Sequence, residues 1–287
     1  MKKIIKYMTR LIPDSLYLRL KYLQRVKKFL NLKAPKTFNE KLQWLKLHDR
    51  NPEYTKMVDK YEVREYIKEK IGEEYLIPLF GVWDSFDEID FDKLPEQFVL
   101  KCTHDSGGLV ICKDKSKLDI EKARQKINRA LKNNYYWHGR EWPYKNVKPR
   151  IIAEKYMSND GNIDTELTDY KFSCFNGRVD NVMLCLERST GDVKFRYFDK
   201  EWNLLRYDVQ GKALQKGYTI PKPEKMDEMF ELAGKLSEGI RYLRVDLYHS
   251  ENKIYFGELT FFPQSGFDTD ILKETDELFG SYLDLNR

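Results

Sequence analysis

The chain has 287 residues, of which 41% are hydrophobic and 34% are charged, and its formal net charge is +5. This length allows about two domains with a sizeable core, and the composition is that of a soluble globular protein. No apolar run approaches the roughly 20 residues needed to cross a bilayer, and no secretory signal is recognisable, so the sequence predicts a cytoplasmic protein.

The first 36 residues are strongly basic, with eleven Lys or Arg residues against a single acid, Asp14. Apolar residues lie between the cations and Pro13 interrupts the run, which predicts two short basic amphipathic helices. Such helices can bind weakly to an anionic membrane, here as a peripheral contact of residues 1–34 with the inner face of the cell membrane. The alternative is that they pack on the body of the protein and expose their lysines. We expect no nucleic-acid partner, because no segment resembles a base-reading module.

Helical and strand-like patterns alternate in the next part of the chain. Thr37 or Asn39 can cap the first helix, and Gly72 ends the second. A Gly-containing loop joins two strands that precede a third, basic helix. The predicted elements are helices over 37–50, 59–75 and 119–134, and strands within 75–83, 98–114 and 150–157.

The four cysteines, Cys102, Cys112, Cys174 and Cys185, lie in apolar strand-like segments and show no CxxC spacing. We therefore expect buried free thiols in a reducing compartment, and neither disulfides nor a zinc site.

The second half of the chain is typical of an antiparallel meander. Its apolar residues alternate, and turn pairs occur at Asn176-Gly177 and Gly191-Asp192. A helix and a hairpin complete the pattern. The predicted elements are strands within 169–187 and 192–208, a helix over 222–240 and a hairpin within 244–267.

This order of elements predicts an α+β fold with a small mixed sheet, a larger antiparallel sheet and a cleft between them. We divide the chain into a basic helical segment (1–36), a part with the first sheet and the Gly loop (37–150), and a part with the larger sheet and the hairpin (151–287).

The hairpin carries two acidic residues in strand-like surroundings. A turn near Asn252 places Asp246 opposite Glu258 and Arg244 opposite Thr260, and the period of two puts all four side chains on one face. Opposed carboxylates about 5 Å apart at Cβ repel each other unless a cation lies between them. An oxygen site of this kind suits Mg²⁺. The alternative is a solvated sheet face with an ion pair from Arg244.

The stretch FVLKCTHDSGG places a lysine on a strand before a Gly loop. Lysine binds phosphate as a point charge, and glycine lets backbone N–H groups approach phosphate oxygens. The spacing is not that of a Walker loop, and a Gly–Gly hairpin turn explains it equally well. The candidate nucleotide contacts are Lys101, His104, Ser106, Gly107 and Gly108.

Two later segments complete the candidate set. Glu154, Lys155 and Tyr156 end an apolar strand and can present backbone groups to adenine, although a strand edge reaching solvent is the simpler reading. Asp169 and Lys171 share a strand face and can hold ribose and phosphate, or form an ion pair of little energetic weight.

In this chain order the candidates resemble the ATP-grasp superfamily and, within it, the TupA-like ATP-grasp family of bacterial surface polysaccharide synthesis. The resemblance covers roughly residues 35–280. It implies an ATP-grasp fold of two α+β subdomains that hold the nucleotide between two antiparallel sheets, with ATP and Mg²⁺ as cofactors. It matches Lys60 to the early lysine helix as a nucleotide contact and Lys101 to the phosphate-binding strand lysine before the flexible loop 104–108. It assigns Glu154 to the adenine hinge, Asp169 and Lys171 to ribose and phosphate, and Asp246 and Glu258 with Thr260 to magnesium.

This sequence departs from the family pattern at two places. The second carboxylate strand usually reads Glu-x-Asn, whereas this chain has Thr260 at the third position, whose hydroxyl can still coordinate Mg²⁺ but implies weaker binding of a second metal ion. The spacing from hinge to ribose is loose, so Asp160 or Asp164 can take the place of Asp169.

The activity implied by the resemblance is that of a carboxylate–amine ligase, with Arg244 and Lys171 as catalytic residues and an acyl phosphate as intermediate. Its partners would be a uronic-acid-containing polysaccharide or precursor and an amino acid or other amine. A sugar kinase would use the same residues. A glycosyltransferase lacks support because no Asp-x-Asp motif ends a strand, and a membrane-associated scaffold would not need the ATP-type residues. Specificity is expected in the aromatic segment 135–148, which can stack on sugars or pack on the core.

Overall fold

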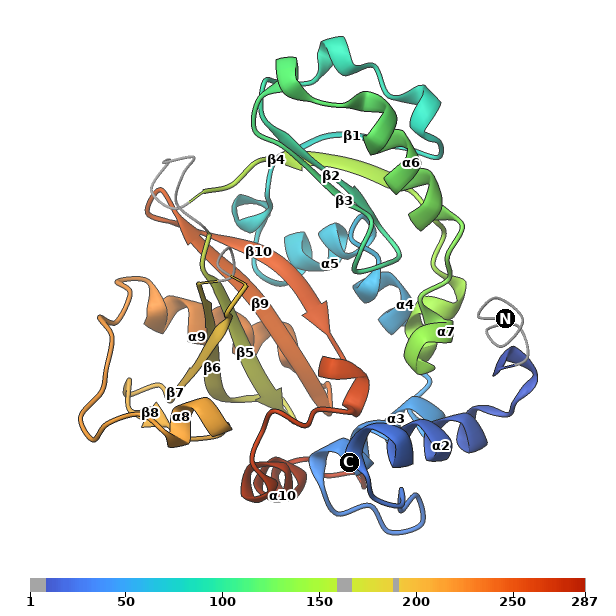
Figure 1. Ribbon diagram of the computed structural model, residues 1–287. Helices are drawn as coiled ribbons and strands as arrows, with labels where there is room; N and C mark the ends of the chain where they lie inside the picture. The colour runs from blue at the N-terminus through green and yellow to red at the C-terminus, as the bar shows by residue number, and fades with distance from the viewer. Residues whose placement is uncertain (1–8, 159–166, 188–190, 287) are drawn as a thin grey trace.

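The computed structural model describes residues 9–158, 167–187 and 191–286. The chain folds around two β-sheets, a small one at the top of Figure 1 and a larger one at the lower left, with helices packed around them. This confirms the predicted α+β class with two antiparallel sheets. The alternative ribose residues Asp160 and Asp164 lie outside the described residues.

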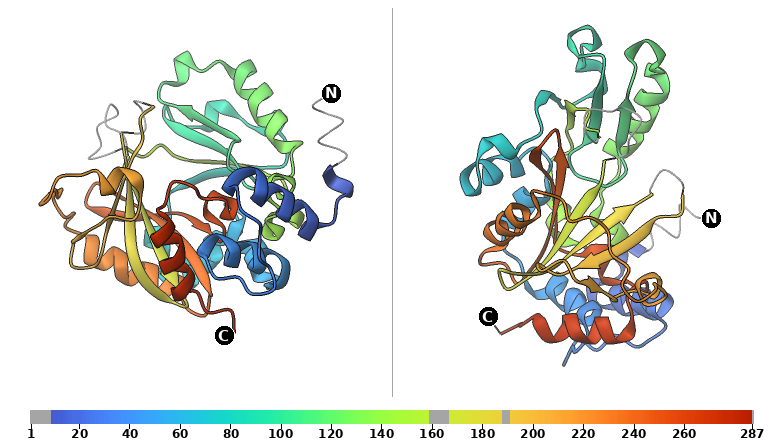
Figure 2. Two further views of the ribbon diagram at one scale, coloured as in Figure 1. Left: turned by 60° about the horizontal axis from the view of Figure 1, so that its bottom comes forward. Right: turned by 90° about the vertical axis from the view of Figure 1, so that its left-hand side faces the viewer.

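The basic segment forms a short 3-10 turn (Thr9–Leu11) and then helix α2 (Asp14–Val26), which begins directly after Pro13. α2 lies along the outside of the molecule beside α3 (Figures 1 and 2). Leu18 and Tyr22 on α2 are buried in a small cluster with Leu30. The described part of the segment therefore packs on the body of the protein, as the alternative prediction stated.

The next three helices are α3 (Phe38–His48), α4 (Glu53–Val58) and α5 (Val63–Lys70). Thr37 caps α3 in a reciprocal capping box with Glu40, as its sequence predicts. The helix expected over 59–75 is shorter. The Asp59 carboxylate accepts hydrogen bonds from the backbone N–H groups of Tyr61 and Glu62 at 2.8 and 3.3 Å, and this turn delays the helix.

The small sheet contains β1 (Leu79–Trp83), β2 (Phe98–Cys102), β3 (Leu109–Cys112) and β4 (Ile151–Lys155), in the order β1-β4-β2-β3. Every pairing is antiparallel, so the expectation of a mixed sheet was wrong. β4 belongs to this sheet although it follows the proposed boundary at residue 150. Helix α6 (Ile120–Leu131), capped by Asp119, packs on the sheet through Ala123 and Ile127.

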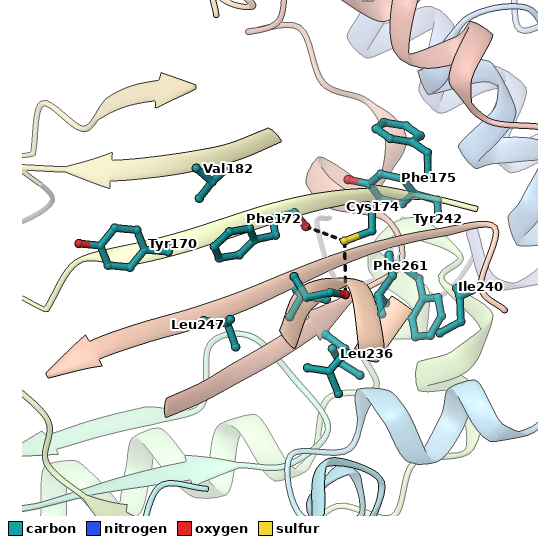
Figure 3. Close-up of a cluster of buried hydrophobic side chains, with 14 of the residues drawn as sticks. Tyr170, Phe172, Cys174, Phe175, Val182, Leu236, Ile240, Tyr242, Leu247 and Phe261 are labelled. Carbon is teal, nitrogen blue, oxygen red and sulfur yellow. Dashed lines mark hydrogen bonds between the residues drawn. The ribbon is translucent and has the colours of Figure 1, made fainter. Parts of the chain in front are cut away.

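The large sheet contains β5 (Asp169–Phe175), β6 (Arg178–Leu186), β7 (Lys194–Phe198), β8 (Leu204–Leu205), β9 (Tyr242–Ser250) and β10 (Lys253–Thr260). Its order is β10-β9-β5-β6-β7-β8, with each neighbouring pair antiparallel. Helix α9 (Met226–Ser237) covers one face, and Figure 3 shows Phe172 and Leu236 within the core between them. The opposite face carries polar side chains.

Short elements connect these units, and the last helix, α10 (Lys273–Tyr282), packs against α3. All four cysteines are buried free thiols, as predicted; Cys174 lies in the core drawn in Figure 3. In the described ranges no helix combines the length and apolarity needed to cross a bilayer. The remaining elements are α7 (Tyr136–Gly139), α8 (Val209–Lys212) and α10 (Lys273–Tyr282), with 3-10 turns at Glu73–Tyr75, Phe86–Glu88, Phe91–Lys93, Lys115–Lys117, Trp142–Asn146 and Pro263–Gly266.

Candidate active site

A cavity of about 500 Å³ is bordered by residues of both sheets. The small sheet contributes Lys101 and Glu154, and the loop after β2 contributes residues 105–108. The polar face of the large sheet supplies the opposite side. The predicted site residues that line this cavity are Lys60, Lys101, Ser106, Gly107, Gly108, Glu154, Asp169, Lys171, Arg244 and Glu258.

The large sheet contributes a row of charged side chains. Glu258 on β10 lies opposite Asp246 on β9, and Asp246 lies opposite Lys171 on β5. Because side chains alternate along a strand, the apolar residues Val245 and Leu247 point to the core instead. The predicted pairings of Asp246 with Glu258 and of Arg244 with Thr260 are therefore confirmed, although the register of the hairpin shifts between Phe256 and Glu258, which was not predicted.

Arg244 joins the two carboxylates of this row. Its Nε and Nη2 donate to Asp246 Oδ1 and Oδ2 at 2.7 Å each, and Nη2 also lies 3.1 Å from Glu258 Oε1 and 3.0 Å from Thr260 Oγ1. Lys171 Nζ donates to Asp246 and lies 3.5 Å from Asp169 Oδ2. The ion pair considered as an alternative thus exists, but it is buried and not on a solvated face, since the Asp246 side chain is 1% exposed.

Mutual neutralisation sets the protonation states of this cluster. Burial alone would raise the pKa of Asp246, but Arg244 and Lys171 outweigh it and lower the pKa below its usual value. Burial would lower the pKa of Arg244 and of Lys171, and in each case the carboxylates, Asp246 foremost, raise it instead. Both cations and Asp246 are therefore charged at neutral pH.

The small sheet presents a second charge cluster. Lys101 Nζ lies 2.7 Å from Glu154 Oε2, and Arg64 Nη1 lies 3.3 Å from Glu154 Oε1. Arg64 is on α5 and lines the cavity as well, which its sequence context did not predict. Its position four residues after Lys60 was the available signal, but one cation among several in a helix is not distinctive. Lys60 itself donates to the backbone carbonyl of Asp105.

Hydrogen bonds connect Gly108 of the loop with residues at the start of the loop and at the end of β2. The Gly108 N–H donates to the Asp105 carboxylate at 3.0 and 3.1 Å, and the Gly108 carbonyl accepts from the Cys102 N–H at 2.7 Å. A Cβ at Gly108 would lie 2.6 Å from Cys102 Sγ and 2.7 Å from Ala130 Cβ, whereas a Cβ at Gly107 would meet nothing within 4 Å. Glycine is thus required at 108 by close packing.

Three predicted nucleotide contacts do not line this cavity. His104 is buried, and its Nε2 is within hydrogen-bond distance of the carbonyls of Ala130 and Asn133 near the end of α6. Lys155 lies 3.5 Å from Glu251, at the turn of the hairpin. The Tyr156 ring packs under the Lys113 ammonium group. The geometry therefore ties these residues to the scaffold.

A second cavity of about 500 Å³ adjoins the first and shares Ser106, Arg244, Glu258 and Gln264 with it. Segment 135–148 contributes much of its wall. The new lining residues from this segment are Tyr135, His138, Glu141 and Tyr144. Other members of the segment, such as the buried Tyr136, pack on the body, so the expectation of packing on the core holds for part of the segment, whereas stacking on sugars stays a prediction.

Lys46 and Glu141 form a buried ionisable pair beside the second cavity, which the sequence did not predict. Lys46 Nζ lies 2.7 Å from the carbonyls of both Gly139 and Ser265, and Ser265 Oγ lies 2.5 Å from Glu141 Oε1. Gln264 and Ser265 both adopt left-handed backbone conformations, with φ of 48° and 55°. Non-glycine residues in this region store strain, which is concentrated here beside the site.

Comparison with known sequences gives one family match. The sequence pattern of the family described as TupA-like ATPgrasp matches residues 40–284. Among curated proteins, no sequence matches the chain.

Solved structures with a similar arrangement are distant in sequence. A D-alanine–D-alanine ligase from Bacillus anthracis complexed with ATP is 17% identical, with a TM-score of 0.46, and the match covers 77% of this chain and 59% of that chain. The D-alanine–D-alanine ligase from Helicobacter pylori is 15% identical, with a TM-score of 0.46, over 88% of this chain and 70% of that chain. The ADP complex of PurK, N5-carboxyaminoimidazole ribonucleotide synthetase, is 15% identical, with a TM-score of 0.46, over 77% of this chain and 50% of that chain.

Proposed function

The chain belongs to the TupA-like ATP-grasp family, and on this premise we propose that it is an ATP-dependent ligase that joins a carboxylate to an amine. Its α+β architecture with two antiparallel sheets is the ATP-grasp fold of that family. The observation that carries the proposal is that Lys171, Arg244 and Glu258 of the large sheet, joined through the buried Asp246, line one cavity together with Lys101 and Glu154 of the other sheet.

The cavity suits a nucleotide with a chain of phosphates. Five cationic side chains line it, and most of them also have carboxylate partners that fix their positions: Lys60, Arg64, Lys101, Lys171 and Arg244. Apolar side chains such as Met183, Phe195 and Ile77 complete the lining and offer contact area to a flat base. We assign Glu154 to the base, Asp169 to the ribose, and the lysines to the phosphates.

The proposed reaction has two steps. A carboxylate oxygen attacks the γ-phosphorus of ATP, the bond to the bridging oxygen breaks, and ADP leaves an acyl phosphate. An amine nitrogen then attacks the carbonyl carbon, the C–O bond to phosphate breaks, and the nitrogen loses a proton, which gives an amide. Arg244 and Lys171 offset the negative charge of the transferred group, and no covalent enzyme nucleophile is needed.

Magnesium fits the oxygen groups of this row, of which Glu258 and Thr260 line the cavities and Asp246 is buried beside them. Asp246, Glu258 and Thr260 supply only oxygen ligands, the kind that Mg²⁺ prefers, and the Glu258 side chain is 43% exposed. In the described ranges no group of three or more His, Cys, Asp or Glu side chains could hold a metal ion, so substrate phosphates and water must supply the remaining ligands. Bound Mg²⁺ would offset phosphate charge.

We extend the proposal to the substrates. The carboxylate would belong to a uronic acid in a surface polysaccharide or its precursor, and the amine to an amino acid. The second cavity supports this extension because it opens from Arg244 and Glu258 and carries aromatic side chains that suit sugar rings. It also carries both signs of charge, with Lys21 and Arg25 against Asp268 and Asp270.

Ligand-induced stabilisation tests the proposal. ATP with Mg²⁺ at about 100 times its Kd should stabilise the protein by about 2.7 kcal/mol, whereas UDP-sugars should not. A panel of uronic acids with ATP and hydroxylamine should then release ADP and form a hydroxamate. Stabilisation by UDP-sugars alone would instead indicate a glycosyltransferase, and ADP release with a stable phosphate ester would indicate a sugar kinase.

A further inference from the structure

Helix α2 has two apolar faces, of which only one is covered. Leu18 and Tyr22 are buried against the body, whereas Leu16, Leu20 and Leu23 are exposed by 48%, 53% and 40%. The spacing of four and three residues places these three leucines on one face of the helix. Leu11 and Phe29, near the two ends of α2, are exposed by 87% and 86%.

This concentration is unusual within the described ranges. Of the ten large hydrophobic residues that are exposed there, five lie between residues 11 and 29. Single exposed apolar side chains are normal on protein surfaces, but a contiguous apolar stripe marks an interaction site. We call Leu16, Leu20 and Leu23 the leucine stripe.

The surroundings of the leucine stripe are cationic. Residues 9–36 contain eight Lys or Arg residues against one acid, Asp14. That acid is already engaged, since Asp14 Oδ1 lies 3.2 Å from Arg140 Nε and 2.7 Å from the Tyr136 hydroxyl. The exposed cations nearest the stripe are Arg19, Lys27 and Lys28.

Charge decides which partner can cover the leucine stripe. A second copy of the chain would bring two surfaces of the same positive sign together, which opposes association. An anionic lipid surface attracts the cations, and its interface accepts shallow apolar side chains. We propose that α2 docks on an anionic lipid surface, with the leucine stripe inserted at the interface and the flanking cations at the headgroups.

The docking would place the neighbouring face of α2, which lines a cavity, close to the membrane. Tyr17, Leu20, Lys21 and Gln24 line a third cavity of about 740 Å³, which is shared with loop residues 105–107 and with Trp137, so Leu20 lies where the leucine stripe borders this cavity. α2 therefore lies between the proposed lipid contact and the cavities of the site. A substrate carried by a lipid would reach these cavities next to the membrane. The docking itself does not depend on the ligase chemistry.

Co-sedimentation of the full chain with lipid vesicles tests the proposal. We expect binding to vesicles of phosphatidylcholine with phosphatidylglycerol, none to phosphatidylcholine alone, and a loss of binding as added salt screens the charges. Leu16→Ser with Leu23→Ser should weaken binding at least about tenfold. Lys27→Gln with Lys28→Gln should weaken it by about fivefold for each cation removed.

Matched variants separate docking from general effects. Ile111→Ser with Ile120→Ser removes two equally exposed apolar residues from another surface, and Lys126→Gln with Lys132→Gln removes two exposed cations there; neither pair should change binding. Because all these positions are exposed, the substitutions should leave the unfolding temperature unchanged. A change in vesicle binding then does not reflect unfolding of the variant. Three outcomes overturn the proposal: no vesicle binding, equal binding to both kinds of vesicle, or self-association that the leucine variants abolish while vesicles are ignored.

Discussion

Asp246 and Glu258 face each other across β9 and β10 and are held by the same nitrogen, Arg244 Nη2, at 2.7 and 3.1 Å. The two carboxylates differ in burial, since the Asp246 side chain is 1% exposed and that of Glu258 is 43% exposed. Asp246 therefore belongs to a buried charge cluster, whereas Glu258 faces the cavities and is available to a ligand.

Neutralising the two carboxylates should separate stability from activity. Asp246→Asn removes the main partner of two buried cations and should lower the free energy of unfolding by about 3–5 kcal/mol. Glu258→Gln removes a half-exposed ion pair and should lower it by less than about 1 kcal/mol. Both variants should lose ATP-dependent turnover. Urea unfolding and ADP release measure the two effects.

Glu251→Gln is the control for this pair, because Glu251 lies at the hairpin turn with a partner at 3.5 Å and no place in the cavity. It should change neither quantity. Full turnover in Asp246→Asn or Glu258→Gln would remove the magnesium assignment. An equal loss of stability in both would contradict the difference in burial.

The sequence predicted this hairpin because strand pairing in a hairpin depends on residues that are close together in the chain. Alternation of period two and a short turn placed Asp246 opposite Glu258 and Arg244 opposite Thr260 correctly, but they did not predict the register shift that precedes Glu258. The positions of the Gly loop and of the capped helix α3 were predictable for the same reason. The ordered motifs then indicated the family, which the sequence match over residues 40–284 confirms.

The parts of the site that were missed depend on long-range packing. Lys46, Glu141 and Ser265 come from three distant segments, and nothing local marks any of them as part of a site. Arg64 and Glu154 meet although 90 residues separate them in the chain. His104 was assigned to the nucleotide because its neighbours suggested a phosphate loop, but the carbonyls at the end of α6 hold its ring elsewhere.

The lysines of the cavity should discriminate between nucleotides. Lys101→Ala and Lys171→Ala should each weaken ATP binding by about tenfold to one-hundredfold, as loss of a charged hydrogen bond predicts. AMP should be affected less, since it lacks the distal phosphates. Lys155→Ala should change neither, because Lys155 pairs with Glu251 and does not line the cavity. Calorimetry with ATP and AMP checks all three, and an equal loss for both nucleotides would place the lysines away from the phosphates.

The two glycines of the loop should respond differently to alanine. Gly108→Ala adds a Cβ within 2.7 Å of Cys102 and Ala130 and should destabilise the protein by about 1–3 kcal/mol through overpacking. Gly107→Ala adds a Cβ in open space, with no positive φ to strain it, and should leave stability within about 0.5 kcal/mol. Thermal unfolding of both variants measures this. Equal effects would mean that the loop moves away from Cys102 in solution.

The buried lysine behind the second cavity should make stability depend on pH. Burial lowers the pKa of Lys46 to about 7, and the nearby Glu141 opposes this shift. Three oxygens, those of Gly139, Ser265 and the Gln43 side chain, accept from Lys46 Nζ at 2.7–3.1 Å, which matches the three donors of a charged ammonium group. Lys46 is thus poised between its charged and neutral forms near neutral pH.

The sign of the dependence follows from proton binding. Below pH 7 both the folded and the unfolded chain hold the proton of Lys46, and its buried charge costs stability in full. Between pH 7 and the ordinary lysine pKa of about 10.4, the unfolded chain binds more protons than the folded one, so the free energy of unfolding rises with pH, by at most about 1.4 kcal/mol per pH unit. Lys46→Met should remove this rise, and urea unfolding of both proteins from pH 6 to about 10 measures the difference. Glu141→Gln should shift the start of the rise below pH 7, because the carboxylate no longer supports the ammonium group. Identical pH profiles for wild type and Lys46→Met would show that Lys46 keeps its proton throughout this range.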